Sequence, residues 1–268
     1  MFGRVDRDRG TGRPLLAWFG VVLMVASFAW LQFSTPPSTP RTAIRVAATE
    51  EPFTVVVLDP GHGGQDSGTI KAGILEKELT LDVAYRARRI LQLQGVDVLL
   101  TRSDDTHVSL ASRAAIANER RNCVFISIHF DNAARPEATG VETYYAAHQT
   151  SKATLAPSWL PFLQRTSLET PNVESQSLAS FIQEALVHHT QAVNRGTTAQ
   201  QFFVIANVRH PAVLVEGGFL TNTDDITKLA TGDYREQIAA AISDGILRYR
   251  DTLRQRQTPI AVSLAGGE

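Results

Sequence analysis

Two histidines and two glutamates of this chain stand where a folded sheet could bring them together. His62, His129 and Glu216 each follow a short apolar run that is typical of a buried parallel strand. Glu76 lies in a loop just ahead of a predicted helix. Because open α/β sheets gather their chemistry at the carboxyl ends of their strands, we expect these four side chains to lie near one another.

Two neutral imidazoles and one carboxylate are a ligand set for a catalytic zinc ion, which keeps its fourth position for water. A further glutamate beside that water would be its general base. The residue pattern leaves open which glutamate would bind the metal. The alternative for His62 is a turn histidine whose ring faces solvent, since it stands among one proline and three glycines. Asp59, just ahead of this turn, could orient a metal-bound imidazole or accept hydrogen bonds from nearby backbone.

Four segments resemble the zinc-dependent N-acetylmuramoyl-L-alanine amidases of bacterial cell-wall metabolism, in the same order along the chain. They are Leu58-Asp59-Pro60-Gly61-His62-Gly63-Gly64, Glu76-Lys77, Ser127-Ile128-His129 and Leu214-Val215-Glu216-Gly217-Gly218-Phe219-Leu220-Thr221-Asn222. The resemblance covers roughly residues 53–250. It implies that His62, Glu76 and His129 bind Zn²⁺. It also implies that Glu216 is the catalytic residue, the base that takes a proton from the attacking water.

The resemblance implies a peptidoglycan hydrolase that cleaves the amide between the lactyl group of N-acetylmuramic acid and L-alanine of the stem peptide. A protein activator is a possible partner. Two alternatives are a non-catalytic wall-binding or activator domain and a zinc peptidase that acts on stem peptides. All four chemical groups are present, which disfavours the first, and the helical His-Glu-x-x-His of many metalloproteases is absent, which disfavours the second. The chain departs from the family pattern at Phe130 and Asp131, which would alter the wall of the cleft and leave the ligands in place.

An apolar segment near the N-terminus predicts a transmembrane or signal helix. Residues 14–33 carry no charge over 20 positions, and a helix of that length spans about 30 Å of hydrocarbon. The preceding residues 1–13 carry four arginines, which places them in the cytoplasm by the positive-inside rule. We expect an uncleaved anchor in the inner membrane, with a cleaved signal peptide as the alternative, and the remaining chain in the periplasm.

The rest of the 268-residue chain is expected to be one catalytic domain with appendages. Residues 34–50 are a linker rich in proline and threonine, 51–250 are the catalytic domain, and 251–268 are a polar tail. Residues 146–176 form an irregular insertion with three prolines, which is either a lid or binding loop or a surface decoration. The net charge of −1 gives no indication of a nucleic-acid partner.

Alternating strand and helix patterns predict an α/β fold with a mostly parallel central sheet flanked by helices. The expected strands cover residues 55–58, 96–100, 123–128, 140–145, 202–205 and 212–215. The expected helices cover residues 79–91, 109–120, 178–193 and 233–249. Ser109 is expected to cap the second of these helices, Gly95 to end the first, and Asp233 with Glu236 to form a capping box for the last.

Overall fold

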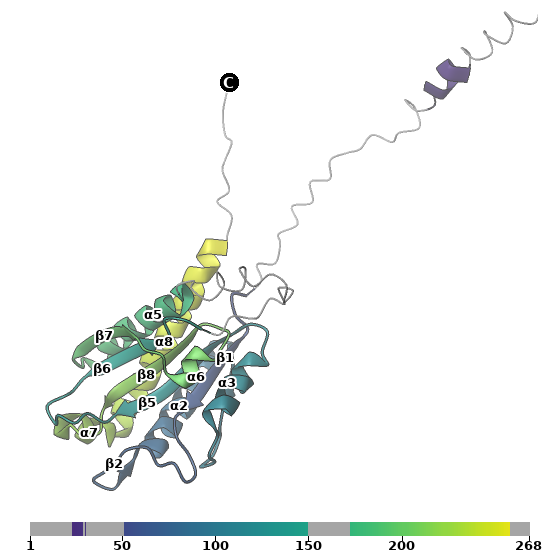
Figure 1. The fold of residues 1–268 in the computed structure, drawn as a ribbon. Helices are drawn as coiled ribbons and strands as arrows, with labels where there is room; N and C mark the ends of the chain where they lie inside the picture. The colour runs from purple at the N-terminus through teal and green to yellow at the C-terminus, as the bar shows by residue number, and fades with distance from the viewer. Residues whose placement is uncertain (1–22, 29, 31–50, 150–171, 258–268) are drawn as a thin grey trace, which may run out of the picture. The chain divides into compact units, whose positions relative to one another are not determined.

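The computed structural model describes residues 23–28, 30, 51–149 and 172–257. The chain divides into one unit at residues 1–48 and a second at 49–268 (Figure 1). In the first unit the described residues are helical, with exposed side chains. Within the described ranges, no helix has both the length and the apolar character needed to cross a membrane. Residues 1–13, which were expected to be cytoplasmic, most of the apolar segment, the expected linker and most of the expected insertion lie outside the described residues.

Six strands of the second unit form one mixed sheet in the order β4-β1-β5-β8-β6-β7. Their bounds are β1 Val55–Pro60, β4 Asp97–Leu100, β5 Cys123–Asp131, β6 Val141–Tyr145, β7 Asn194–Ala199 and β8 Ala212–Phe219. The first four in sheet order are parallel, β6 runs antiparallel to β8, and β7 is parallel to β6. A separate hairpin pairs β2 (Ile70–Lys71) with β3 (Ile74–Leu75). The predicted α/β fold with a mostly parallel sheet is confirmed.

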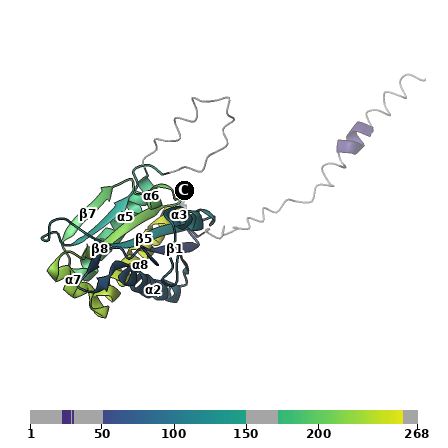
Figure 2. The same ribbon diagram turned by 60° about the horizontal axis from the view of Figure 1, so that its bottom comes forward.

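Helices cover the two faces of this sheet unequally (Figures 1 and 2). On one face lie α2 (Glu76–Leu93), α5 (Val173–Thr190) and α8 (Gly232–Gln257). On the other, the helices among the described residues are α3 (Leu110–Asn118) and α6 (Phe203–Ala206), while α7 (Thr223–Leu229) follows β8. Alternate residues of the central strands enter the two hydrophobic clusters, as the period of two in a strand requires. Val56 and Leu58 face the first, and Val57 the second.

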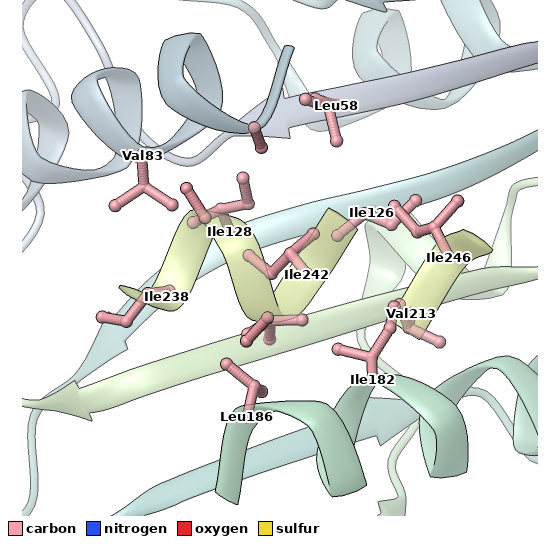
Figure 3. Packing of buried hydrophobic residues seen from close by; sticks show 14 of the residues in the cluster. Leu58, Val83, Ile126, Ile128, Ile182, Leu186, Val213, Ile238, Ile242 and Ile246 are labelled. Carbon is pink, nitrogen blue, oxygen red and sulfur yellow. The ribbon is translucent and has the colours of Figure 1, made fainter. Parts of the chain in front are cut away.

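The larger cluster is organised by α8, which lies between α2 and α5. Figure 3 shows Ile238, Ile242 and Ile246 of α8 pointing among side chains of the sheet and of the neighbouring helices. All three are fully buried, and burying each is worth about 1.5–3 kcal/mol. A Cβ placed on Gly245 would lie 2.6 Å from the Cα of Ile182, so glycine is what permits the close approach of α8 and α5.

The short helices of the second face leave the carboxyl ends of the central strands uncovered. Phe125 of β5 and Leu214 of β8 are buried beneath α3 and α6. Two or four residues further along the same strands and on the same face stand Ser127, His129 and Glu216. His129 and Glu216 are only partly buried. The fold therefore opens at the edge where the sequence predicts the site.

One predicted strand is wrong, and one strand of the six-stranded sheet was not predicted, nor were the two short strands of the hairpin. Residues 202–205 were expected to be a strand, but the structure has α6 there, with Val204 and Ile205 buried in the second cluster. The strand instead lies at 194–199, where the sequence Asn-Arg-Gly-Thr-Thr-Ala has no apolar alternation. A strand at the edge of a sheet needs few buried side chains. Pairing with its neighbour in the fold can therefore outweigh the weak strand propensity of this sequence.

The predicted helix boundaries also differ in places. Ser109 caps α3 as expected, and Gly95 follows the end of α2 in a left-handed conformation with φ of 70°. The capping box of Asp233 with Glu236 is wrong, because the Thr231 hydroxyl accepts from the backbone of α8 and Glu236 binds two arginines of α2 instead. Helix α8 continues beyond residue 250 to Gln257, so the expected tail is helical in its first part; residues 258–268 lie outside the described ranges.

Candidate metal centre

His62 lies in the turn after β1 and takes a left-handed backbone conformation with φ of 62°. Such a conformation is uncommon for a residue with a side chain. Just before it, a Cβ on Gly61 would stand 2.3 Å from Cε1 of His129. The glycine thus leaves room for the second imidazole to lie against the turn of the first.

Two buried arginines fix this turn through its carbonyl groups. Arg113 donates from Nη2 to the carbonyl of His62 at 2.6 Å, and from Nη1 to the carbonyl of Pro60 at 2.6 Å and to Asp59 at 2.7 Å. Arg102 donates from Nε to the same Pro60 carbonyl at 3.0 Å. Because the left-handed backbone of His62 is unfavourable by itself, these charge-assisted bonds help to hold it.

Asp59 belongs to this buried network. Among the described residues it neither orients an imidazole nor accepts hydrogen bonds from nearby backbone, the two roles expected from the sequence. Its carboxylate accepts from Arg113, from the hydroxyl of Thr101 at 2.5 Å and from the hydroxyl of Ser127 at 2.8 Å. The carboxylate at Nδ1 of the His62 imidazole belongs to Asp66, whose Oδ1 lies 2.9 Å from that nitrogen. Asp66 was missed by the sequence analysis, although its position four residues after the histidine was a usable signal.

His62, Glu76 and His129 converge, as predicted. Oε1 of Glu76 lies 2.9 Å from Nε2 of His62 and 3.1 Å from Nδ1 of His129. The three candidate ligand atoms all lie within 4.8 Å of one another. Glu76 is the first residue of α2 and is buried, and its second oxygen accepts from the backbone of Thr69 at 2.9 Å. Two imidazole nitrogens and one carboxylate oxygen fit the donor set of a catalytic zinc ion.

The charges of this cluster are coupled. Burial alone would raise the pKa of Glu76, but hydrogen bonds with His129 and His62 hold that pKa well below its usual range. Burial alone would lower the pKa of His62, but Glu76 and then Asp66 raise it. The acidic groups therefore stabilise a positive charge at this point, which a proton or a divalent cation can supply.

Glu216 lies beside this cluster in the sheet. It is the register partner of His129 across β5 and β8, and of Glu142 across β8 and β6. Its Oε2 is buried and has no hydrogen-bond partner among the described residues. Burial is the main reason that the pKa of Glu216 is raised well above its usual range, and the nearby carboxylates of Asp131, Glu76 and Glu142 add to the shift.

A cavity of about 530 Å³ opens beside the two histidines on the side of α3. Its polar lining includes His62, Asp66 and His129, together with Asp59, His107, Ser109 and Arg113, and its apolar lining is Val108, Leu110 and Val204. A second cavity of about 710 Å³ lies at the other side, beyond the ends of β5 and β8. One cavity is thus lined by two of the candidate metal ligands, and the other begins just past the carboxyl ends of the strands that carry His129 and Glu216.

Comparison with known proteins agrees with this geometry. Residues 56–248 match the Amidase_3 family, described as N-acetylmuramoyl-L-alanine amidase. The chain belongs to this family. It is 31% identical over 219 residues to N-acetylmuramoyl-L-alanine amidase AmiA of Escherichia coli, with 73% of this chain and 75% of that protein covered. It is 35% identical over 215 residues to the amidase LytC of Bacillus subtilis, with 79% of this chain but 39% of LytC covered.

Solved structures of the amidase family share the fold. An N-acetylmuramoyl-L-alanine amidase from Clostridium difficile 630 superposes with a TM-score of 0.63 at 33% identity, with 75% of this chain and 98% of that chain covered. The CwlD amidase of Clostridioides difficile, solved in complex with the GerS lipoprotein, gives a TM-score of 0.62 at 26% identity and covers 74% of this chain and 99% of its own. The resemblance read from the sequence motifs is thus confirmed at the level of the family.

Proposed function

We propose that this amidase-family chain hydrolyses peptidoglycan at the amide between the lactyl group of N-acetylmuramic acid and L-alanine of the stem peptide. We further propose that His62, Glu76 and His129 hold the Zn²⁺ that this reaction uses. The observation that carries the proposal is the convergence of one candidate ligand atom from each of these residues within 4.8 Å at an open edge of the sheet. The imidazoles and the carboxylate leave a fourth position for water or substrate.

When bound, Zn²⁺ would polarise the scissile carbonyl and lower the pKa of a water molecule. The protein supplies the rest of the chemistry. Glu216 would accept the proton of the attacking water and pass it to the departing amine of L-alanine. Its buried Oε2, with no partner among the described residues, is an acceptor for that proton. Asp66 would fix the tautomer of His62 through Nδ1, so that Nε2 keeps its lone pair for the metal.

Mass spectrometry of digested peptidoglycan would test the cleaved bond. Intact stem peptides with a free L-alanine amine are the expected product. Fragments cut within the stem peptide would support the zinc peptidase instead. An absence of any soluble product, with the protein folded and loaded with zinc, would favour the non-catalytic wall-binding or activator domain.

We also propose that the catalytic domain works in the cell envelope, on the periplasmic side of an inner-membrane anchor at residues 14–33. The support is the charge-free apolar segment after four arginines, together with a substrate that lies outside the cytoplasm. We also propose a protein activator as a partner, supported by the relative CwlD, which was solved in complex with the GerS lipoprotein. Protease added to spheroplasts should digest the domain; protection of the domain would contradict this topology.

A further inference from the structure

The cavity beyond the ends of β5 and β8 begins at Asp131, two residues after the candidate metal ligand His129. Its lining includes the register partners Asp131 and Phe219, which lie two residues after His129 on β5 and three residues after Glu216 on β8, where the register shifts. A strand advances 3.2–3.4 Å per residue, so the cavity begins about 7 Å past the metal ligand along β5. Arg195, on β7, forms another part of the wall.

Arg195 is held in place and still has donors to offer. Its Nε donates to Oε2 of Glu142 at 3.1 Å, and its guanidinium lies 4.8 Å from the centre of the Phe219 ring. Glu142 is fixed in turn by the hydroxyl of Thr198 at 2.8 Å. Among the described residues the two Nη groups of Arg195 have no hydrogen-bond partner, and the side chain is 37% exposed. A guanidinium fixed along one edge is suited to bind a carboxylate with the other.

The cavity carries both signs of charge. Arg135 and Arg195 are its basic residues, and Asp131 and Glu137 its acidic ones. A ligand with only negative charge would be repelled at the acidic wall, whereas a peptide that has carboxylates and an amine matches both. The cavity on the other side of the histidines also has acidic and basic residues, but its Arg113 is buried and paired with Asp59. Its apolar residues Val108, Leu110 and Val204 suit the carbon face of a sugar. The peptide part of the substrate is therefore assigned to the cavity at Arg195, and the sugar part to the cavity beside the histidines.

We propose that the cavity at Arg195 is the subsite for the stem peptide, and that Arg195 binds the carboxylate of the residue after L-alanine. This inference rests on the proposed function. An extended peptide advances about 3.3–3.6 Å per residue, so the second residue beyond the lactyl carbonyl lies about 7 Å from it. This length matches the step from His129 to Asp131, where the cavity begins. Arg195 would therefore determine specificity for the peptide and take no part in the proton transfers.

Two synthetic muropeptides would test the subsite with the purified full-length, zinc-loaded protein. They differ only in a carboxylate or a carboxamide at the residue after L-alanine. We expect kcat/KM to be about 10–100-fold higher for the carboxylate, the range for a charge-assisted hydrogen bond. Arg195→Gln should lose this preference, mainly through a higher KM for the carboxylate substrate. Arg195→Lys should keep part of it, because the charge remains.

Thr198→Val is the matched control, since it removes the other hydrogen bond to Glu142 and leaves the guanidinium in the cavity. It should keep the preference for the carboxylate. Equal cleavage of both substrates by the parent protein would overturn the subsite while leaving the proposed activity intact, and this comparison needs no variant to fold. An Arg195→Gln protein that keeps the full preference would overturn it as well. Cleavage of neither substrate would refute the proposed function and the subsite with it.

Discussion

His129 and Glu216 are register partners on the neighbouring parallel strands β5 and β8. Adjacent strands lie about 4.7–4.9 Å apart, so the sheet itself sets the spacing between a candidate metal ligand and the candidate base. Loop motion has little influence on this spacing, because both residues belong to the central part of the sheet. His62 and Glu76, by contrast, come from a turn and from the first residue of a helix and depend on contacts that fix those segments.

The first prediction is that the three converging residues bind one zinc ion. His62→Ala and His129→Ala should each lose most of the bound zinc, because two remaining ligands hold the ion weakly. Metal analysis of the purified proteins measures this directly. His107→Ala is a suitable control, since that imidazole lines the neighbouring cavity outside the convergent set and its loss should leave the metal stoichiometric. Full zinc retention in both ligand variants would refute the assignment.

The second prediction concerns Arg113, a positioning residue of the His62 turn. Arg113→Met should lower zinc affinity by about 10–100-fold, the usual effect of removing a group that orients a ligand. It should also destabilise the fold by about 3–5 kcal/mol, because it leaves Asp59 charged and buried without its partner. Chelator competition measures the first effect, and denaturant unfolding measures the second.

A second substitution separates these two effects. Asp59→Asn combined with Arg113→Met removes the unpaired charge and should recover part of the stability, but it does not restore the hydrogen bond to the His62 carbonyl. Zinc affinity should therefore remain low. If affinity returned together with stability, Arg113 would be a structural residue with no specific role at the metal centre.

The third prediction is a pH dependence of the metal-free protein. The pKa of Glu76 is lowered on folding, so its contribution to stability is present above about 4.5 and is lost as the pH falls through the folded value. The pKa of His62 is raised, so its contribution is present below about 6.5 and is lost as the pH rises through the folded value. Stability should thus decline on both sides of this window. Thermal unfolding of Glu76→Gln across the same pH range should show a flatter profile; an unchanged profile would mean that other groups cause it.

The fourth prediction tests the packing of α8. Ile242→Ala should cost about 2–5 kcal/mol in the free energy of unfolding, since the side chain is fully buried between helices and sheet. Gly245→Ala should also destabilise the fold, because the added Cβ would meet the backbone of Ile182 at 2.6 Å. Leu93→Ala, at an exposed position, is the control and should change little. A fully stable Gly245→Ala protein would show that α5 and α8 can separate without cost.

The sequence predicts the central strands because their apolar runs end abruptly at polar residues, as at His129. It does not predict their order in the sheet, and the pairing of His129 with Glu216 depends on that order. Arg113 lies 51 residues after His62 in the sequence and donates a hydrogen bond to its carbonyl. The local sequence around either residue does not predict this hydrogen bond. The errors at 194–199 and 202–205 have the same origin: an edge strand can be polar, and an apolar run can form one turn of helix.

The fifth prediction separates metal binding from catalysis at Glu216. Glu216→Gln keeps the shape of the side chain but removes the group that would accept a proton. We expect the rate of amide cleavage to fall by about 10²–10⁴, the range for general acid–base catalysis, with zinc still stoichiometric. Glu184→Gln is a control, because this exposed carboxylate of α5 pairs with Arg248 on the opposite face of the sheet.

The pH profile of the same variant gives an independent reading of the role of Glu216. Burial and the surrounding carboxylates raise the pKa of Glu216, and a base must lose its proton before it can act. In the parent protein kcat/KM should therefore rise with pH through the value that Glu216 has in the zinc-loaded site. The residual activity of Glu216→Gln should lack this rise. A fully active variant would exclude the base, and a variant without zinc would make Glu216 a fourth ligand, which would close the position that the attacking water needs.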